Sequence, residues 1–135
     1  MVKQLLIQSR GAGLTDFTRE VAAVVTDSAI MEGLCTVFLQ HTSASLIIQE
    51  NADADVQRDL QNWLSRLVPE GDPLYTHTAE GPDDMPAHIK TALTSNSLSI
   101  PVMAGRLVLG TWQGIYLWEH RRHNTRRQVV VHVGN

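Results

Sequence analysis

The chain has 135 residues, of which 43% are hydrophobic and 19% are charged. This composition is typical of one globular domain and excludes a disordered chain. The single cysteine, Cys35, excludes a disulfide scaffold or a zinc ribbon within one chain. No apolar run approaches the roughly 20 residues of a membrane-spanning helix, and residues 1–10 lack a signal-peptide core. We therefore expect one cytoplasmic domain over residues 1–135.

The net charge of −3 is distributed unevenly along the chain. Residues 1–49 carry three basic and four acidic groups, residues 50–84 carry two and nine, and residues 85–135 carry six and one. An acidic middle segment is thus followed by a basic final third. Six histidines lie in or near these segments: His41, His77, His88, His120, His123 and His132.

Hydrophobic periodicity predicts a mixture of helices and strands. We expect a strand at 3–8, a helix at 16–28 capped by Thr15, strands at 34–40 and 44–49, a helix at 55–67 capped by Asp53, and a short helix capped by Asp84. Strands at 97–102 and 106–109 flank a turn, and strands at 111–120 and 127–133 form a hairpin. Because helices precede hairpins, these elements predict an α+β fold with helices packed on an antiparallel sheet.

The first polar segment is HTSAS at residues 41–45, between two expected strands. His41 can point from this joint into a cleft. The hydroxyls of Thr42 and Ser43, together with the nearby backbone, offer a place to bind an anion. The alternative is a polar turn with a buried, hydrogen-bonded histidine.

The second polar segment, residues 50–55, leads into a helix. Asp53 suits the N-cap position, and acidic residues suit the helix N-terminus through the dipole. Glu50 and Asn51 are not needed for capping, so they are the better functional candidates.

The third segment, residues 77–88, holds two histidines and three carboxylates in a loop leading into a helix. Imidazoles and carboxylates are the usual ligands of zinc and similar divalent ions. A catalytic metal site needs three protein ligands and an open position. His77 and His88 supply two, and His41 supplies a third if the fold brings it near. The alternative is a solvated acidic loop with Asp84 as the helix cap.

Two further segments have mixed interpretations. Glycines bracket residues 111–113, and glycine within a strand often marks the close approach of a ligand or backbone. Trp112 and Trp118 are expected as core or subunit-contact anchors, which leaves Thr111 and Gln113 open. Four arginines within residues 121–127 suit phosphate or nucleic acid. The overall acidity of the chain instead favours a solvated hairpin or intersubunit salt bridges, so we expect neither a nucleic-acid nor a membrane partner.

Four segments taken together resemble the YjbQ-like family of small bacterial and archaeal proteins. They are HTSAS at 41–45, ENADADVQRDL at 50–60, EGPDDMPAHIK at 80–90 and GRLVLGTWQGIYLWEHR at 105–121. The resemblance implies an α+β sandwich, a homotrimer and a weak ability to make thiamine phosphate. The recurrent polar residues of the family match His41, Asn51, Asp53, Asp59, His77, Glu80, His88, Thr111 and Gln113.

The resemblance also implies roles for individual residues. A divalent metal ion, zinc in first place, would be held by His41, His77 and His88. With such an ion in place, we hypothesise that Glu80, Asn51 and Asp53 are catalytic and that a small phosphorylated substrate is bound by Thr42, Ser43, Arg106, Thr111 and Gln113. The implied reaction is an alkyl or aryl transfer that joins a pyrimidine pyrophosphate to a thiazole phosphate and releases pyrophosphate. The alternative is a trimeric binding or structural protein whose catalysis is incidental.

Overall fold

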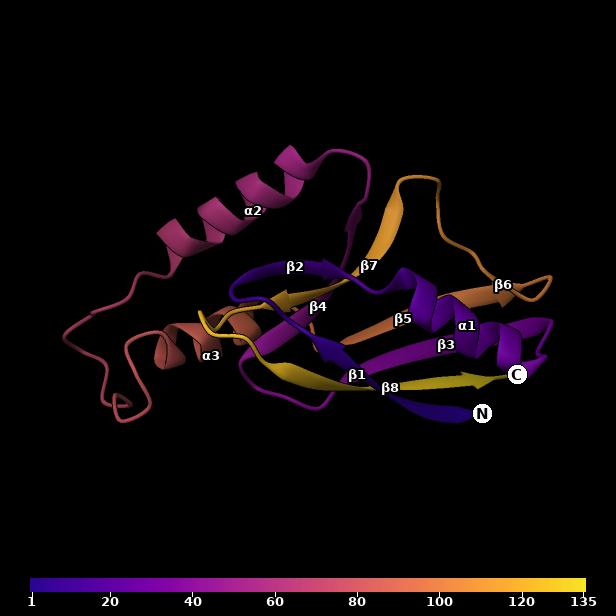
Figure 1. The fold of residues 1–135 in the computed structure, drawn as a ribbon, viewed down its shortest axis with the longest axis horizontal. Coiled ribbons are helices and arrows are strands. Elements are labelled where there is room, and N and C mark those ends of the chain that lie inside the picture. The colour runs from indigo at the N-terminus through magenta and orange to yellow at the C-terminus, as the bar shows by residue number, and fades with distance from the viewer.

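Eight strands and three helices make up the computed structural model, which describes all 135 residues (Figure 1). The strands are β1 (Val2–Gln8), β2 (Gly13–Asp16), β3 (Glu32–Leu39), β4 (Ala44–Glu50), β5 (Ser97–Met103), β6 (Arg106–Leu107), β7 (Gln113–Glu119) and β8 (Arg126–Gly134). The helices are α1 (Thr18–Ser28), α2 (Ala54–Leu67) and α3 (Asp84–Leu93). None of the three helices combines the length and the hydropathy that a membrane-spanning helix requires.

The strands form two antiparallel sheets. One has the order β1-β8-β3-β5-β6 and the other has the order β2-β7-β4. In the smaller sheet Ala44 pairs with Glu119 and Glu50 pairs with Gln113, so β4 and β7 run side by side along their whole length. The expected α+β class with antiparallel pairing is confirmed.

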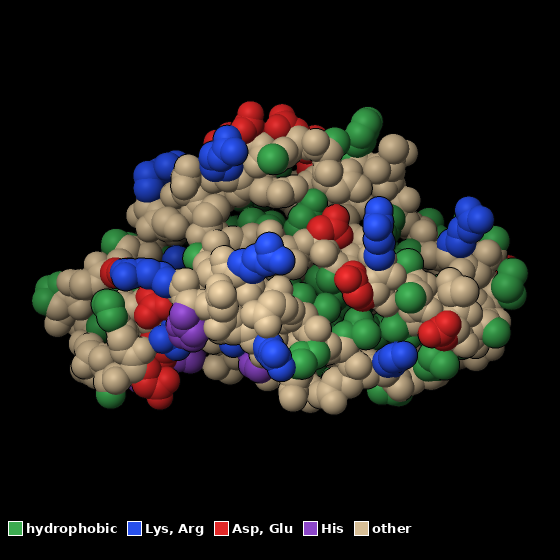
Figure 2. All heavy atoms as spheres, viewed as in Figure 1, with side chains coloured by type: hydrophobic (Ala, Val, Ile, Leu, Met, Phe, Trp, Pro, Cys, Tyr) green, Lys and Arg blue, Asp and Glu red, His purple; other side chains and the backbone are tan.

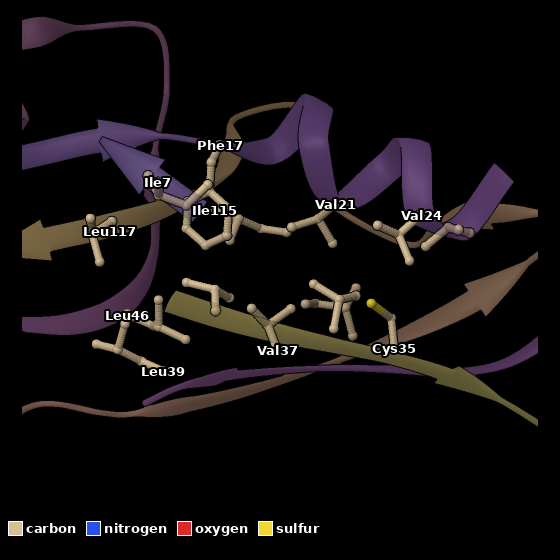
Figure 3. Packing of buried hydrophobic residues seen from close by; sticks show 14 of the residues in the cluster. Ile7, Phe17, Val21, Val24, Cys35, Val37, Leu39, Leu46, Ile115 and Leu117 are labelled. Carbon is tan, nitrogen blue, oxygen red and sulfur yellow. The ribbon is translucent and has the colours of Figure 1, made fainter. Parts of the chain in front are cut away.

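The main core lies between the two sheets and α1. Alternate residues of β3 and β8, such as Val37 and Val131, are fully buried on the inner face of the larger sheet. Val21 and Val24 of α1 and Ile115 of β7 close over this face (Figure 3). Burying each such side chain contributes roughly 1.5–3 kcal/mol. The larger sheet therefore presents its other face to the outside.

The helices α2 and α3 belong to the layer around the smaller sheet. Leu64 and Val68, at the end of α2, pack with Trp118 of β7, whose indole Nε1 donates to Gln61 Oε1 at 2.7 Å. Thr91 of α3 donates to the Ala44 carbonyl at 3.3 Å. The contact of Thr91 places the last turn of α3 beside Ala44, within HTSAS and at the start of β4.

Two expectations about the strands are wrong. The strands β7 and β8 do not form a hairpin, because they belong to different sheets and residues 120–125 pass between them. β2 was not expected at all, since four residues with one large apolar side chain, Leu14, are too few to show a period. Thr15 consequently lies within a strand and does not cap α1. Asp16 instead satisfies a free amide at the start of α1, because its Oδ1 accepts the Thr18 amide at 2.9 Å.

Candidate metal centre

Two imidazoles converge on one carboxylate oxygen at the start of α3. His77 Nε2 lies 2.6 Å and His88 Nε2 lies 3.1 Å from Asp84 Oδ2. Asp84 and His88 share one face of α3 because they are four residues apart, and His77 comes from the preceding loop. The ligand atoms of these three residues all lie within 4.8 Å of one another. Figure 2 shows histidine side chains gathered with acidic and basic ones at this end of the molecule.

The second oxygen of Asp84 is held by an arginine. Arg121 Nη1 donates to Asp84 Oδ1 at 2.7 Å, and Arg121 Nε donates to Asp83 Oδ2 at 3.0 Å. Burial alone would raise the pKa of Asp84, but the hydrogen bond from His77 and the charge of Arg121 outweigh it and lower that pKa. Asp84 is therefore a buried, ionised carboxylate with one oxygen free to face the imidazoles. The expectation that Asp84 caps α3 is wrong, since Asp83 occupies the N-cap position without a side-chain cap bond.

The hydrogen bonds of His88 define which of its nitrogens carries a proton. Nδ1 lies 3.0 Å from the Thr42 carbonyl oxygen, which can only accept, so Nδ1 is the donor. In the neutral ring Nε2 then carries a lone pair, and this lone pair faces the negative Asp84 Oδ2. Two electron-rich atoms at 3.1 Å repel each other, and a proton or a cation between them removes this repulsion. The geometry thus suits a positively charged species at this point.

His41 lies outside the three-residue group. Its Nε2 accepts the backbone amide of Gln128 at 2.8 Å, so that nitrogen is already engaged. Burial, and then the charge of Arg127, lower the pKa of His41. His41 is linked to the group only through its neighbour Thr42, which holds His88.

The remaining predicted site residues fall at separate places. Glu80 is exposed and accepts from Arg121 Nη2 through its backbone oxygen at 2.9 Å. The Ser43 carbonyl accepts from Arg127 at 3.2 Å, beside the cluster. Arg106 begins β6, where it lines a hollow shared with α1.

Asn51, Thr111 and Gln113 lie at the far end of the smaller sheet. The cluster is at the Ala44–Glu119 end of the β4–β7 pair, whereas Asn51 follows the Glu50–Gln113 end. Six residue steps at roughly 3.4 Å separate the two ends by about 20 Å. Asn51 Nδ2 donates to the Gln113 carbonyl at 3.5 Å. Within one chain these residues do not share a site with the histidines.

Asp53 caps α2, with its Oδ1 accepting the Asp55 amide at 2.9 Å. The sequence offered this function for Asp53 as the alternative to a catalytic role. Trp112 is 62% exposed and is not a core anchor, whereas Trp118 is 3% exposed.

Two residues of the cluster escaped prediction as site residues, Asp84 and Arg121. The spacing of Asp84 and His88 is itself a signal, because residues four apart on a helix face the same way. For Arg121 no local signal exists, since its carboxylate partners lie 37 and 38 residues away. Two of the arginines near the cluster form ion pairs with the acidic middle segment: Arg121 pairs with Asp83 and Asp84, and Arg122 pairs with Glu70.

The fold and this cluster define a class: a small α+β protein of two antiparallel sheets with a histidine–carboxylate group at one end. The family model described as "UPF0047 protein YjbQ-like" matches residues 3–135. The chain therefore belongs to the YjbQ-like UPF0047 family.

Relatives and solved structures cover almost the whole chain. A UPF0047 protein of Synechocystis is 56% identical over 96% of this chain and 88% of its own length. YjbQ of Escherichia coli O157:H7 is 41% identical over 95% and 93%, respectively. A crystal structure of a YjbQ/UPF0047 family protein from Clostridium acetobutylicum matches with a TM-score of 0.86 at 38% identity, covering 99% of both chains. A protein of Aeropyrum pernix matches with a TM-score of 0.90 at 26% identity, covering 100% of this chain and 98% of that one.

Proposed function

We propose that the chain is a cytoplasmic, cation-binding enzyme whose divalent ion, zinc in first place, is held by His77, Asp84 and His88. The observation that carries the proposal is the convergence of two imidazole nitrogens on one buried carboxylate oxygen. Two imidazoles, one carboxylate and an open position are the ligand set of many catalytic zinc sites. Asp84 takes the place that the sequence suggested for His41.

Both the spacing of the three ligands and the hydrogen bonds around them bear on zinc binding. A tetrahedral zinc site places its ligand atoms about 3.3 Å apart. The His88 Nε2–Asp84 Oδ2 separation of 3.1 Å is close to this value, whereas His77 Nε2 and Asp84 Oδ2 are at a hydrogen-bond distance of 2.6 Å and must move apart by roughly 0.7 Å for both to bind the ion. The bonds from His88 Nδ1 to the Thr42 carbonyl and from Arg121 to Asp84 Oδ1 orient two of the three ligands. Hydrogen-bonded partners of this kind accompany metal ligands in most sites.

The substrate that we propose is a small phosphorylated molecule. Residues 50–84 carry a net charge of −7, and Arg121 and Arg122 are already committed to acidic partners near the cluster. A pyrophosphate group would be repelled here without an added positive charge. A divalent ion held by His77, Asp84 and His88 would supply that charge where a pyrophosphate departs. We take the reaction itself from the resemblance to the family: it is the thiamine-phosphate-forming transfer that releases pyrophosphate.

Two residues beside the metal ligands, Arg121 and Glu80, have specific roles in the proposed reaction. Arg121 keeps Asp84 ionised and oriented. Glu80 is exposed beside the cluster, so its carboxylate is available to accept a proton or to hold a water molecule.

The experiment measures release of pyrophosphate from the pyrimidine pyrophosphate and thiazole phosphate, with zinc and with a chelator. We expect turnover that zinc restores after chelation and that Asp84→Asn abolishes. His41→Ala should retain zinc-dependent turnover, because His41 Nε2 is engaged by Gln128. Zinc binding without any turnover would favour the second reading, a binding protein with incidental catalysis.

We also propose that the chain forms a homotrimer through the outer face of the larger sheet. The outward positions of its central rows carry no ionisable Asp, Glu, Lys or Arg side chain; they are Val2, Gln4, Leu6, Leu34, Thr36, Phe38, Ser97, Ser99, Pro101, Gln128, Val130 and His132. Val2 is 66% and Leu6 is 56% exposed. Glu32 and Arg126 lie only at the two ends of this face. A partly apolar sheet face whose central rows lack charge is typical of an interface between subunits.

A further inference from the structure

We propose that Glu119 and Arg127, an ion pair buried beneath the candidate metal centre, are positioning residues that hold the metal ligands in place. The inference rests on the proposed function, since it concerns the same centre. Neither residue touches the ligand atoms directly. They act through two separate chains of hydrogen bonds.

The ion pair joins the ends of two strands from different sheets. Glu119 closes β7 and is 0% exposed, and Arg127 lies near the start of β8 and is 6% exposed. Arg127 Nε donates to Glu119 Oε1 at 2.8 Å, and Nη2 donates to Oε2. The Thr125 hydroxyl also donates to Glu119 Oε1. Two parallel bonds fix both the distance and the direction of the pair.

The first chain of bonds runs from Glu119 to Asp84. Glu119 Oε2 accepts the backbone amides of His120 and Arg121, each at 3.1 Å. The carboxylate therefore sets the path of the backbone where it leaves β7. That path aims the Arg121 guanidinium at Asp84 Oδ1, which leaves Oδ2 for the imidazoles.

The second chain of bonds runs from Arg127 to His88. Arg127 Nη2 donates to the Ser43 carbonyl at 3.2 Å. The preceding carbonyl, that of Thr42, accepts from His88 Nδ1. Arg127 thus fixes the peptide segment that selects the His88 tautomer. One ion pair controls both the carboxylate and one imidazole of the centre.

A purely stabilising role explains this pair poorly. Removing two charges from water costs more than their attraction returns in many proteins, and apolar replacements are often as stable. Both chains of hydrogen bonds begin at this pair. Glu119 accepts the amide of Arg121, which orients Asp84, and Arg127 donates to the carbonyl of Ser43, the residue next to Thr42, which orients His88. Positioning accounts for a charged pair at this point.

The test compares Glu119→Gln and Arg127→Lys with a matched control, Val131→Ala, a fully buried β8 residue of the main core. Two quantities are measured: zinc affinity by competition with a chelating dye, and the ring ¹⁵N chemical shifts of His88 in the metal-free protein at pH 8. We expect both charged-pair variants to bind zinc 10–100-fold more weakly, with His88 losing its fixed Nδ1–H tautomer. Val131→Ala should be destabilised yet keep its affinity within about twofold and its tautomer unchanged.

The outcomes separate this inference from the proposed function. Wild-type affinity and an unchanged His88 tautomer in both variants would overturn positioning and leave the metal site standing. Absence of zinc binding in the wild type would overturn the metal site. The metal-free ¹⁵N shifts would then decide positioning alone: a changed His88 ring supports it and an unchanged ring overturns it. Arg127→Lys keeps the charge but not the fork, so it carries the test if Glu119→Gln does not fold.

Discussion

Asp83 and Asp84 are adjacent in the sequence, yet the fold gives them different surroundings. Asp83 pairs with Arg121 and accepts the Arg122 amide at 3.0 Å, which ties the loop to the end of β7. Asp84 shares Arg121 but also faces two imidazoles. The helical geometry at residue 84, set by the first turn of α3, is what directs one carboxylate to the histidines. The sequence predicted His77 and His88 as partners, but the carboxylate between them depends on this local backbone.

The burial of His120 leads us to expect that the stability of the fold depends on pH. It is 3% exposed, its Nε2 lies 2.8 Å from Ser45 Oγ, and burial, with the nearby charge of Lys90, lowers its pKa to about 3. Between pH 6.5 and 3 the unfolded chain therefore binds a proton that the folded chain does not. The free energy of unfolding must fall as the pH falls through this window.

For His120→Gln we expect a smaller loss of stability in acid. Between pH 7.5 and pH 5 the wild type should lose about 2 kcal/mol through this one group, and the variant should lack that contribution. Urea unfolding at the two pH values measures the difference. His123→Gln, at an exposed position, serves as the control and should follow the wild type. Equal pH dependence in wild type and His120→Gln would contradict the assignment.

At the scale of elements, the sequence predicts a helix best where the hydrophobic period extends over many residues and the capping residue directly precedes it. α2 was expected at 55–67 and spans Ala54–Leu67, with Asp53 as its cap. α1 begins two residues late because its first turn follows an unexpected strand. The arrangement of β7 and β8 could not be read from the sequence, since nearness along the chain favours a hairpin. It is decided by distant partners: β7 pairs with β2 and β4, and β8 pairs with β1 and β3.

The cap of α2 gives a test at this scale. Asp53→Ala removes the acceptor for the Asp55 amide, so we expect a loss of about 1 kcal/mol in the free energy of unfolding. Asp53→Asn should keep most of the stability, because an amide oxygen also caps. Asp59→Ala on the exposed side of the same helix is the control and should change stability little. If Asp53→Ala matches the wild type in urea unfolding, the cap contributes nothing.

Across the whole molecule, the uneven charge seen in the sequence becomes a set of internal ion pairs. The basic final third returns to the acidic middle segment through Arg121 and Arg122, and Arg127 pairs with the one acidic residue of its own third, Glu119. For these arginines the sequence favoured a solvated hairpin or intersubunit salt bridges over nucleic-acid binding. Within-chain pairing became visible only once the fold brought residues 70–84 beside residues 121–122.

The proposed trimer predicts the effect of a charge on the outer sheet face. Phe38→Glu places a carboxylate at a 44% exposed position of β3, so burial in an interface becomes unfavourable. Sedimentation should give about three times the 15.0 kDa chain mass for the wild type and one chain mass for Phe38→Glu. Trp63→Glu, on α2 and 52% exposed, should remain trimeric. A monomeric wild type, or a trimer that only Trp63→Glu disrupts, would contradict this choice of face.

Zinc content and affinity test the central claim most directly. Purified chain, stripped with a chelator and titrated with Zn²⁺ at pH 7.5, should bind one ion per chain. Asp84→Asn and a His77→Ala/His88→Ala double variant should lose that binding, whereas Asp55→Asn, at an exposed ion pair on α2, should retain it. A wild-type chain that binds no zinc, or a double variant that binds it unchanged, would contradict a metal centre at the start of α3.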